Sequence, residues 1–234
     1  MSGARRTSRA VKPLSAVLSL LVASTAALAS IAQAAPAAPA RGELPAYTSK
    51  VSRIDNATLA RMRYSHRAGC PVKVKDLRLV RLTYYGFDAK AHTGELVVAA
   101  AVAGDVTAAF GRLYEARFPI ARMVLVDNYK GSDARSMAAN NTSAYNCRKV
   151  AGTSRWSEHS YGRAVDINPV QNPYVQGRSV APAAGRAYVD RSQDVPGLIR
   201  AKDAVVKAFA VEGWGWGGIW RASKDYQHFS STGR

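Results

Sequence analysis

Apolar and polar residues alternate in a way that predicts two strands and two helices in the body of the chain. Residues 77–87, LRLVRLTYYGF, alternate apolar with basic side chains, as in a strand with one wet face, and residues 94–102, GELVVAAAV, predict a second strand. Residues 105–118 have apolar side chains at helical spacing, and Pro119 ends that helix because it has no N–H to donate. Residues 198–211 predict another helix.

Shorter patterns predict one turn of helix and four further strands. The turn is expected at residues 55–62, and the strands at 122–129, 146–150, 163–168 and 226–230. Helices and strands are mixed without regular alternation or internal repeat, which favours an α+β fold. The 234 residues, 47% of them hydrophobic, are enough for one core. We therefore expect a single α+β domain whose small, mainly antiparallel sheet is flanked by helices.

The N-terminal residues have the three-part layout of a secretory signal peptide. A basic region at residues 5–12 precedes an apolar run at 14–31 and the small residues Ala32-Gln33-Ala34. A membrane anchor is the alternative, but the run is rich in Ala and Ser and leads into AAPAAPA, which favours cleavage. No later stretch is long enough to span a bilayer. The expected divisions are a signal peptide at 1–34, a flexible Ala/Pro-rich linker at 35–54 and a folded domain at 55–234.

Charge and cysteine content add expectations about partners and compartment. The net charge of +17 falls to +13 without the signal peptide, so the exported chain should adhere to polyanions. Export favours an anionic cell wall over nucleic acid, although charge that serves only solubility remains an alternative. Cys70 and Cys147 are expected to pair in an oxidising compartment. A reactive thiol or a metal ligand is the alternative, but neither cysteine lies in a CxxC pair.

The stretch SEHSYGRAVDIN, residues 157–168, combines a histidine and an aspartate that a turn can bring together. His159 precedes Asp166, Gly162 permits the turn, and Ala164 permits close backbone packing. We expect His159 to end a loop and Asp166 to lie on the following strand. Taken alone, the stretch fits an ordinary packed or surface histidine better than it fits half of a metal site.

A second stretch, KDYQHFS, adds His228 and Asp225. Residues an odd number apart on one strand face opposite sides, so these two share a site only if a turn or bulge separates them. Two His and one Asp are good zinc ligands, and a fourth position left to water makes such a site catalytic. His159, Asp166 and His228 are therefore the candidate ligands, with Asp225 as a spare carboxylate.

The order and spelling of these stretches resemble a known family. SEHSYGRAVD followed by DYQHF is similar to the SxHxxGxAxD and DxxHF motifs of D-alanyl-D-alanine carboxypeptidases and L-alanyl-D-glutamate peptidases. These zinc enzymes are related to lysostaphin-type peptidases and to the hedgehog signalling domain. GELVV, FPI, NNTSAYNCR and GWGWGGIW also look like segments of an exported bacterial branch.

The resemblance implies a role for each site residue. His159, Asp166 and His228 would hold Zn²⁺, and Asp225 would act as general base and acid. Arg148 is the best match for an arginine that stabilises negative charge on the substrate carbonyl. The three tryptophans of the Gly-Trp run would line the cleft or pack in the core, and they are Trp214, Trp216 and Trp220. His66 and His92 have no motif around them and are expected to be non-catalytic.

The resemblance therefore implies a secreted, wall-associated zinc peptidase that cuts peptidoglycan stem peptides. The bond is either L-alanyl-D-glutamate or D-alanyl-D-alanine, and Asp225, where carboxypeptidases often carry Glu, favours the endopeptidase. We expect a monomer with no nucleic-acid partner. The alternative function is a non-catalytic, zinc-containing wall-binding module, as the hedgehog relatives illustrate. A basic nucleic-acid binder would leave the His/Asp set unexplained.

Overall fold

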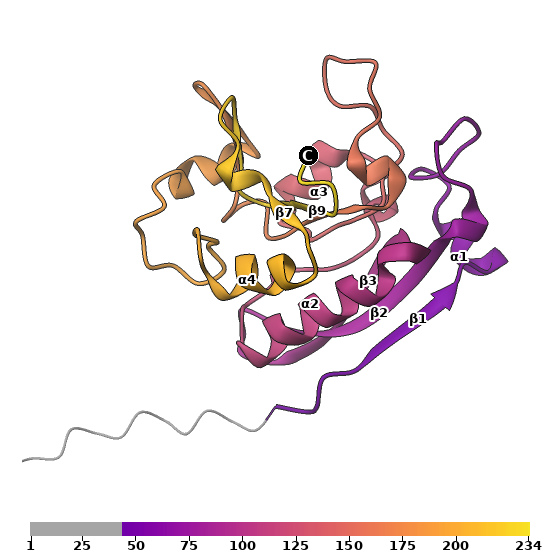
Figure 1. Ribbon diagram of the computed structural model, residues 1–234, viewed down its shortest axis with the longest axis horizontal. Helices are drawn as coiled ribbons and strands as arrows, with labels where there is room; N and C mark the ends of the chain where they lie inside the picture. Colours follow the sequence, from indigo (N-terminus) through magenta and orange to yellow (C-terminus); the bar gives the residue numbers. More distant parts are fainter. Residues whose placement is uncertain (1–43) are drawn as a thin grey trace, which may run out of the picture. The chain divides into compact units, whose positions relative to one another are not determined.

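The α+β class is confirmed by the computed structural model, which describes residues 44–234 (Figure 1). Within that range, short antiparallel sheets are combined with four α-helices and several 3₁₀ turns. The predicted signal peptide and the linker up to residue 43 lie outside the described residues. No described helix has the length and apolar character needed to cross a membrane.

The first sheet contains the two strands that the alternating pattern predicts, and one that it does not. Its antiparallel strands, in spatial order, are β1 (Ser49–Arg53), β2 (Leu77–Tyr85) and β3 (Ala91–Ala99). Strand β1 falls inside the segment 35–54 that was expected to be linker. It is an edge strand with little apolar content, so its main-chain pairing with β2 has no hydrophobic signature.

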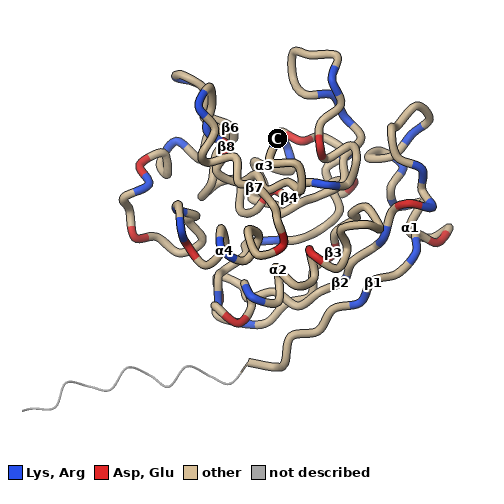
Figure 2. Tube along the Cα trace, in the orientation of Figure 1, with Lys and Arg blue, Asp and Glu red and all other residues tan. Residues whose placement is uncertain are grey.

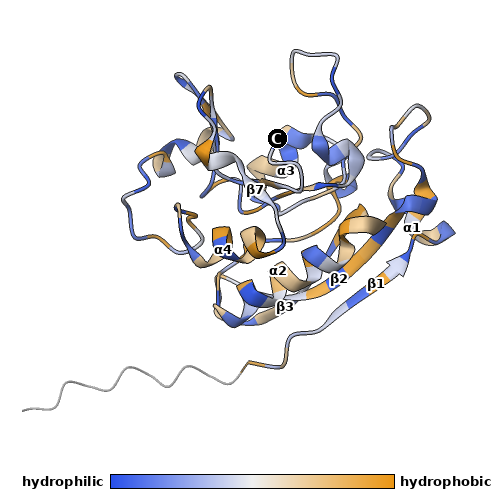
Figure 3. Cartoon of the chain, in the orientation of Figure 1, coloured by the Kyte–Doolittle hydropathy of each residue, from blue (hydrophilic) through white to orange (hydrophobic). Residues whose placement is uncertain are grey.

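One large core joins this sheet to the two longer helices, α2 (Ala103–Glu115) and α4 (Ala204–Val211). Helix α2 lies along the sheet and contacts α4 on its other side, and apolar residues follow α2, β2 and β3 (Figure 3). Phe209 of α4 packs edge-on against Phe110 at 6.0 Å and stacks on Phe229 at 4.4 Å. The core therefore reaches the C-terminal strand that carries the second motif.

Two further sheets of short strands carry the candidate site. One consists of β4 (Ala164–Asp166), β9 (His228–Ser230) and β7 (Gly215–Trp216) in that order. The other consists of β6 (Ser179–Ala181), β5 (Tyr174–Gln176) and β8 (Lys224–Asp225). All strand pairs in both sheets are antiparallel.

The remaining helices are short and begin with side-chain caps. Asp55 accepts a hydrogen bond from the main chain of Thr58 at the start of α1 (Asn56–Arg61), which is the predicted turn of helix. Ser132 caps α3 (Asp133–Ala138) in the same way.

Three local predictions need correction. Residues 122–129 form only an isolated bridge at Met123 and then a 3₁₀ turn, because Asp127 accepts main-chain hydrogen bonds from Tyr64 and Ser65 instead of continuing a strand. Residues 146–150 make only one isolated bridge. Helix α4 begins at Ala204, because residues 200–203 form a turn in which Asp203 accepts from the main-chain N–H of Arg200.

The predicted disulfide is present. Cys70 and Cys147 are bonded, with their Cα atoms 5.9 Å apart. Cys147 is almost fully buried in a second, smaller core that includes Met62, Leu79 and Tyr145. The bond ties the loop after α1 to the segment that leads into Arg148.

Candidate metal centre

Asp166 and His228 are brought together by strand register. They are directly opposed in the antiparallel β4–β9 pair, so their side chains leave the sheet on the same face. The preceding pair, Val165 and Phe229, points to the opposite face and is fully buried in the large core. The core contacts of one face therefore fix the position of the two polar side chains on the other.

His159 reaches the same place from a 3₁₀ turn, η4 (Glu158–Tyr161). Ser157 caps the turn by accepting from the main-chain N–H of His159, and Gly162 ends it with φ +65°. A Cβ atom at Gly162 would lie 2.6 Å from the main-chain nitrogen of Ala99, so glycine suits this position for two reasons. The expected arrangement of loop, turn and strand is confirmed.

The three side chains converge on one point and are almost completely buried. His159 Nε2 lies 3.3 Å from His228 Nδ1 and 3.1 Å from Asp166 Oδ2, and His228 Nδ1 lies 3.0 Å from Asp166 Oδ1. Ligand atoms around a tetrahedral zinc at its usual bond lengths are about 3.3 Å apart. The spacing of the donor atoms therefore fits a small divalent cation.

Hydrogen bonds on the outer side of each ring select the nitrogen that faces the centre. His159 Nδ1 donates to the main-chain oxygen of Ala144 at 2.6 Å, and His228 Nε2 donates to that of Arg234 at 3.0 Å. In neutral rings, lone pairs on His159 Nε2 and His228 Nδ1 then point at the carboxylate of Asp166. Such a set requires a positive charge, either a proton or a metal ion, at its centre.

The pKa directions express the same requirement. Burial lowers the pKa of His228, but the hydrogen bond and charge of Asp166 outweigh burial and raise it to about 9. Burial raises the pKa of Asp166, but the charge of His159 and the hydrogen bonds from both histidines hold it well below its usual range. The cluster thus favours an ionised carboxylate beside a cation.

Asp225 lies next to this cluster on a different sheet. It ends β8, a bend at residues 226–227 follows, and His228 begins β9, so the required turn is present. Gly217 packs against both residues, and a Cβ atom there would lie 2.7 Å from the main-chain oxygen of Asp225. Asp225 Oδ1 is buried without a hydrogen-bond partner among the described residues, and burial raises the pKa of this carboxyl to about 7.

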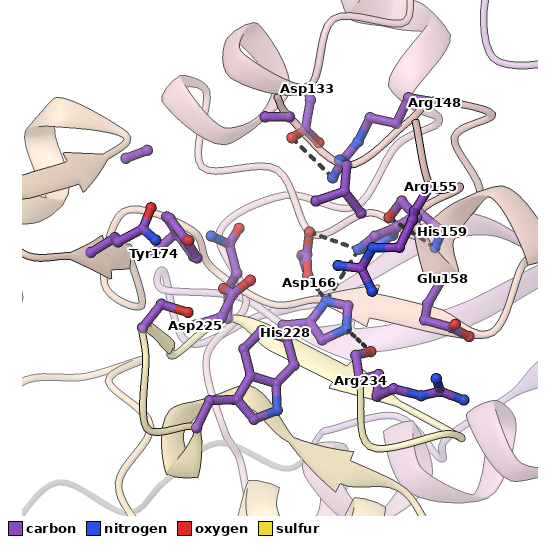
Figure 4. Close-up of a pocket in the computed structure, with 18 of the residues that line it drawn as sticks. Asp133, Arg148, Arg155, Glu158, His159, Asp166, Tyr174, Asp225, His228 and Arg234 are labelled. Atoms are coloured by element: carbon purple, nitrogen blue, oxygen red, sulfur yellow. Dashed lines mark hydrogen bonds and ion pairs between the residues drawn. The ribbon is translucent and has the colours of Figure 1, made fainter. Parts of the chain in front are cut away.

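All these side chains line one cleft of about 1250 Å³ (Figure 4). Arg148 is one of the residues that line it, and it forms an ion pair with Asp133, the first residue of α3, at 3.0 Å between Nη2 and Oδ2. Arg148 Nε is buried without a hydrogen-bond partner in the described structure. The structure therefore brings all five predicted site residues to one cleft.

Of the three tryptophans, only Trp220 lines the cleft. Its ring lies 5.4 Å from that of His228. Trp214 and Trp216 are buried in the large core, and the Trp216 indole donates to the main-chain oxygen of Tyr226. His66 bonds to Tyr145 and His92 to Asp88, and neither lines the cleft.

Several cleft residues were not anticipated from the sequence. Asp133 is the clearest example, because its ion pair with Arg148 joins α3 to the segment that follows the disulfide-bonded Cys147. The sequence around Asp133 offers only Ser132, a capping residue that predicts the start of a helix. It does not predict that Asp133 contacts Arg148. Arg155, Glu158 and Arg163 also line the cleft, and Glu158 pairs with Arg163 at 3.2 Å.

Comparison with known protein families gives a match over the segment that carries the candidate ligands. Residues 151–231 match the family described as D-alanyl-D-alanine carboxypeptidase. The match confirms the resemblance to this family over residues 151–231, but it does not distinguish an exported branch. The matched segment contains the three candidate ligands and Asp225, whereas Arg148 lies just outside it. No curated protein and no solved structure matches the chain.

Proposed function

We propose that this protein is an exported zinc peptidase that hydrolyses a peptide bond in peptidoglycan stem peptides. One observation carries the proposal: two histidines and an aspartate converge beside Asp225, whose Oδ1 is buried with no hydrogen-bond partner among residues 44–234, within the segment that matches the carboxypeptidase family. The coarser conclusion, a hydrolase of the peptidase class with a possible metal site, follows from the match and the convergence together.

His159, Asp166 and His228 are the proposed ligands. Their donor set of two imidazoles and one carboxylate is typical of catalytic zinc. When bound, zinc supplies a Lewis acid for the scissile carbonyl and lowers the pKa of water. The bonds from the histidine rings to Ala144 and Arg234 would keep both rings in the ligand tautomer.

Asp225 is the proposed general base and acid. Its Oδ1 accepts the proton of the attacking water and returns it to the leaving amine. In the metal-free protein, burial raises the pKa of this carboxyl to about 7, so its surroundings favour the protonated form that returns the proton to the amine. Arg148 is the proposed donor to the carbonyl oxygen as negative charge develops there, and Asp133 holds its guanidinium at the cleft.

The proposed location and partner follow from the N-terminal pattern and the charge. Lys and Arg outnumber Asp and Glu by 33 to 16, and they recur along the described chain (Figure 2). A positive surface would hold an exported enzyme on an anionic wall. Either L-alanyl-D-glutamate or D-alanyl-D-alanine remains the proposed bond.

Mass spectrometry of defined muropeptides tests the proposal. The zinc-loaded protein should release either a peptide that begins with D-glutamate, from cleavage after L-alanine, or a terminal D-alanine. It should leave casein largely intact. The variants His159→Ala and His228→Ala should lose both zinc and cleavage. Zinc binding and wall adhesion without any cleavage would instead identify the protein as a non-catalytic wall-binding module. Full metal retention in both variants would refute the site.

A further inference from the structure

We propose that residues 231–234, the closing segment, position the metal ligand His228 through a main-chain oxygen. This inference rests on the proposed function only in taking His228 as a metal ligand. The two histidines of the cluster each donate their outer N–H to a main-chain oxygen. For His159 that oxygen belongs to Ala144, in the body of the fold, but for His228 it belongs to Arg234 in the closing segment.

Two donors meet at the oxygen of Arg234. His228 Nε2 lies 3.0 Å from it, and the hydroxyl of Ser230, which is fully buried, lies 2.7 Å from it. The closing segment thus folds back over the strand that carries the ligand. Because Nε2 keeps its hydrogen for this bond, the lone pair of a neutral ring is held on Nδ1, which faces Asp166.

Several contacts that do not involve the proposed metal ligands hold residues 231–234 in a turn next to His228. Gly233 adopts φ +72°, and its main-chain N–H donates to the oxygen of Ser230 at 3.2 Å. The indole of Trp220 donates to the oxygen of Gly233 at 3.0 Å. The N–H of Ser231 donates to the oxygen of Arg163 at 3.0 Å. The oxygen of Arg234 is therefore placed by a defined turn with three anchors.

Gly215 of β7 makes room for this turn. A Cβ atom at Gly215 would lie 2.6 Å from the Cα atom of Gly233, a distance that real Cβ atoms essentially never show. A substitution at Gly215 would therefore push the closing segment away from His228. Gly215 contributes no side chain to the cleft. A substitution there would therefore change metal binding by displacing the closing segment.

Metal affinity, measured by chelator competition with Zn²⁺, tests the inference independently of cleavage. A variant that lacks residues 233–234 should bind zinc about 10- to 100-fold more weakly, the usual loss when a group that orients a ligand is removed. Arg234→Ala is the matched control, because it keeps the main-chain oxygen and should keep the affinity. Equal affinity in the folded deletion variant and the unaltered chain would overturn the inference.

Gly215→Ala provides a second route if the deletion variant does not fold. It should also weaken zinc binding. In the metal-free protein, at an alkaline pH where the ring is neutral, the ¹⁵N shifts of His228 should report a mixture of ring tautomers where the unaltered chain shows one. A single tautomer and unchanged affinity in Gly215→Ala would count against the inference. An unaltered chain that binds zinc but cuts no muropeptide would refute the proposed function and leave this inference standing.

Discussion

At the scale of single residues, Asp225 is held where its charge is disfavoured. Its Oδ1 is buried, has no hydrogen-bond partner among the described residues, and lies beside the ionised Asp166. Buried polar atoms are nearly always paired, and exceptions concentrate at functional sites. A carboxylate kept in this state is suited to proton transfer and costs the fold some stability.

Replacing Asp225 should separate catalysis from metal binding. Asp225→Asn keeps the size of the side chain and removes the base, so zinc content should persist while turnover falls about 100- to 10,000-fold. Zinc analysis and muropeptide cleavage of both proteins, side by side, provide the measurement. Undiminished cleavage by the variant would remove Asp225 from the mechanism.

The same substitution should stabilise the metal-free protein at alkaline pH. The folded pKa of Asp225 is raised to about 7 from its ordinary 3.8, so folding favours the protonated form. Stability from this group is therefore present at low pH and lost as pH rises from about 4 through about 7. Asn does not ionise, so the Tm of Asp225→Asn should exceed that of the unaltered chain at pH 8 but not at pH 4. Parallel Tm curves across this range would contradict the raised pKa.

Arg148 should matter for turnover and not for zinc. Arg148→Ala removes a donor to the developing charge, so the expected loss of turnover is about 100- to 1,000-fold with full zinc content. Asp133→Asn should reproduce part of this loss, because it releases the guanidinium. Activity of Arg148→Ala equal to that of the unaltered chain would show that the carbonyl oxygen is stabilised elsewhere.

At the scale of elements, the metal centre depends on tight turns packed against the first sheet. The turn after η4 inserts Gly162 against β3, where the main-chain N–H of Ala99 donates to its oxygen at 2.9 Å. This contact links the sheet of β1–β3 to the His159 turn. The first sheet thus supports the site although it contributes no candidate ligand.

Gly162→Ala should destabilise the fold more than an equivalent change elsewhere. Gly152 is a matched control, with φ +71° and open space around its Cα, whereas Gly162 has φ +65° and a neighbouring main-chain nitrogen. Gly152→Ala should cost about 1–2 kcal/mol from backbone strain alone. Gly162→Ala should cost more, because the backbone must also move. Denaturant unfolding compares them, and equal costs would show that the contact with Ala99 is easily relaxed.

At the scale of the whole molecule, one disulfide connects the N-terminal loop to the segment that holds Arg148. The bond joins residues 77 positions apart in the sequence. Closing a loop of this length restricts the unfolded chain and favours the folded state by roughly 4 kcal/mol in the chain-entropy account. The smaller core around Cys147 then keeps the Arg148 segment against the sheet.

Removing the disulfide should lower stability without abolishing zinc binding. The double variant Cys70→Ser, Cys147→Ser should lose up to about 4 kcal/mol of unfolding free energy, because the unfolded chain regains its freedom. The ligands lie on β4, β9 and η4, which the bond does not cross, so zinc content should persist. Guanidinium titration and metal analysis give the two readouts. A variant that loses zinc but keeps its full unfolding free energy would show that the disulfide supports the metal site and not the stability of the fold.

The sequence by itself determined what local patterns can express. Alternation located β2 and β3, helical spacing located α2, and Gly162 marked the turn between His159 and Asp166. These features are determined by residues that are close together in the sequence, so a short stretch of sequence is enough to predict them. The order of His and Asp residues also indicated the family, because those residue types are rare and chemically specific.

Only the tertiary structure decided which distant groups meet. The burial of Trp214 and Trp216, the failure of residues 122–129 to pair as a strand, and the pairing of Asp133 with Arg148 all depend on contacts between separate elements. The oxygens of Ala144 and Arg234 that orient the histidines have no signature at all. Every residue carries a main-chain oxygen, so its use depends on where the folded chain places it.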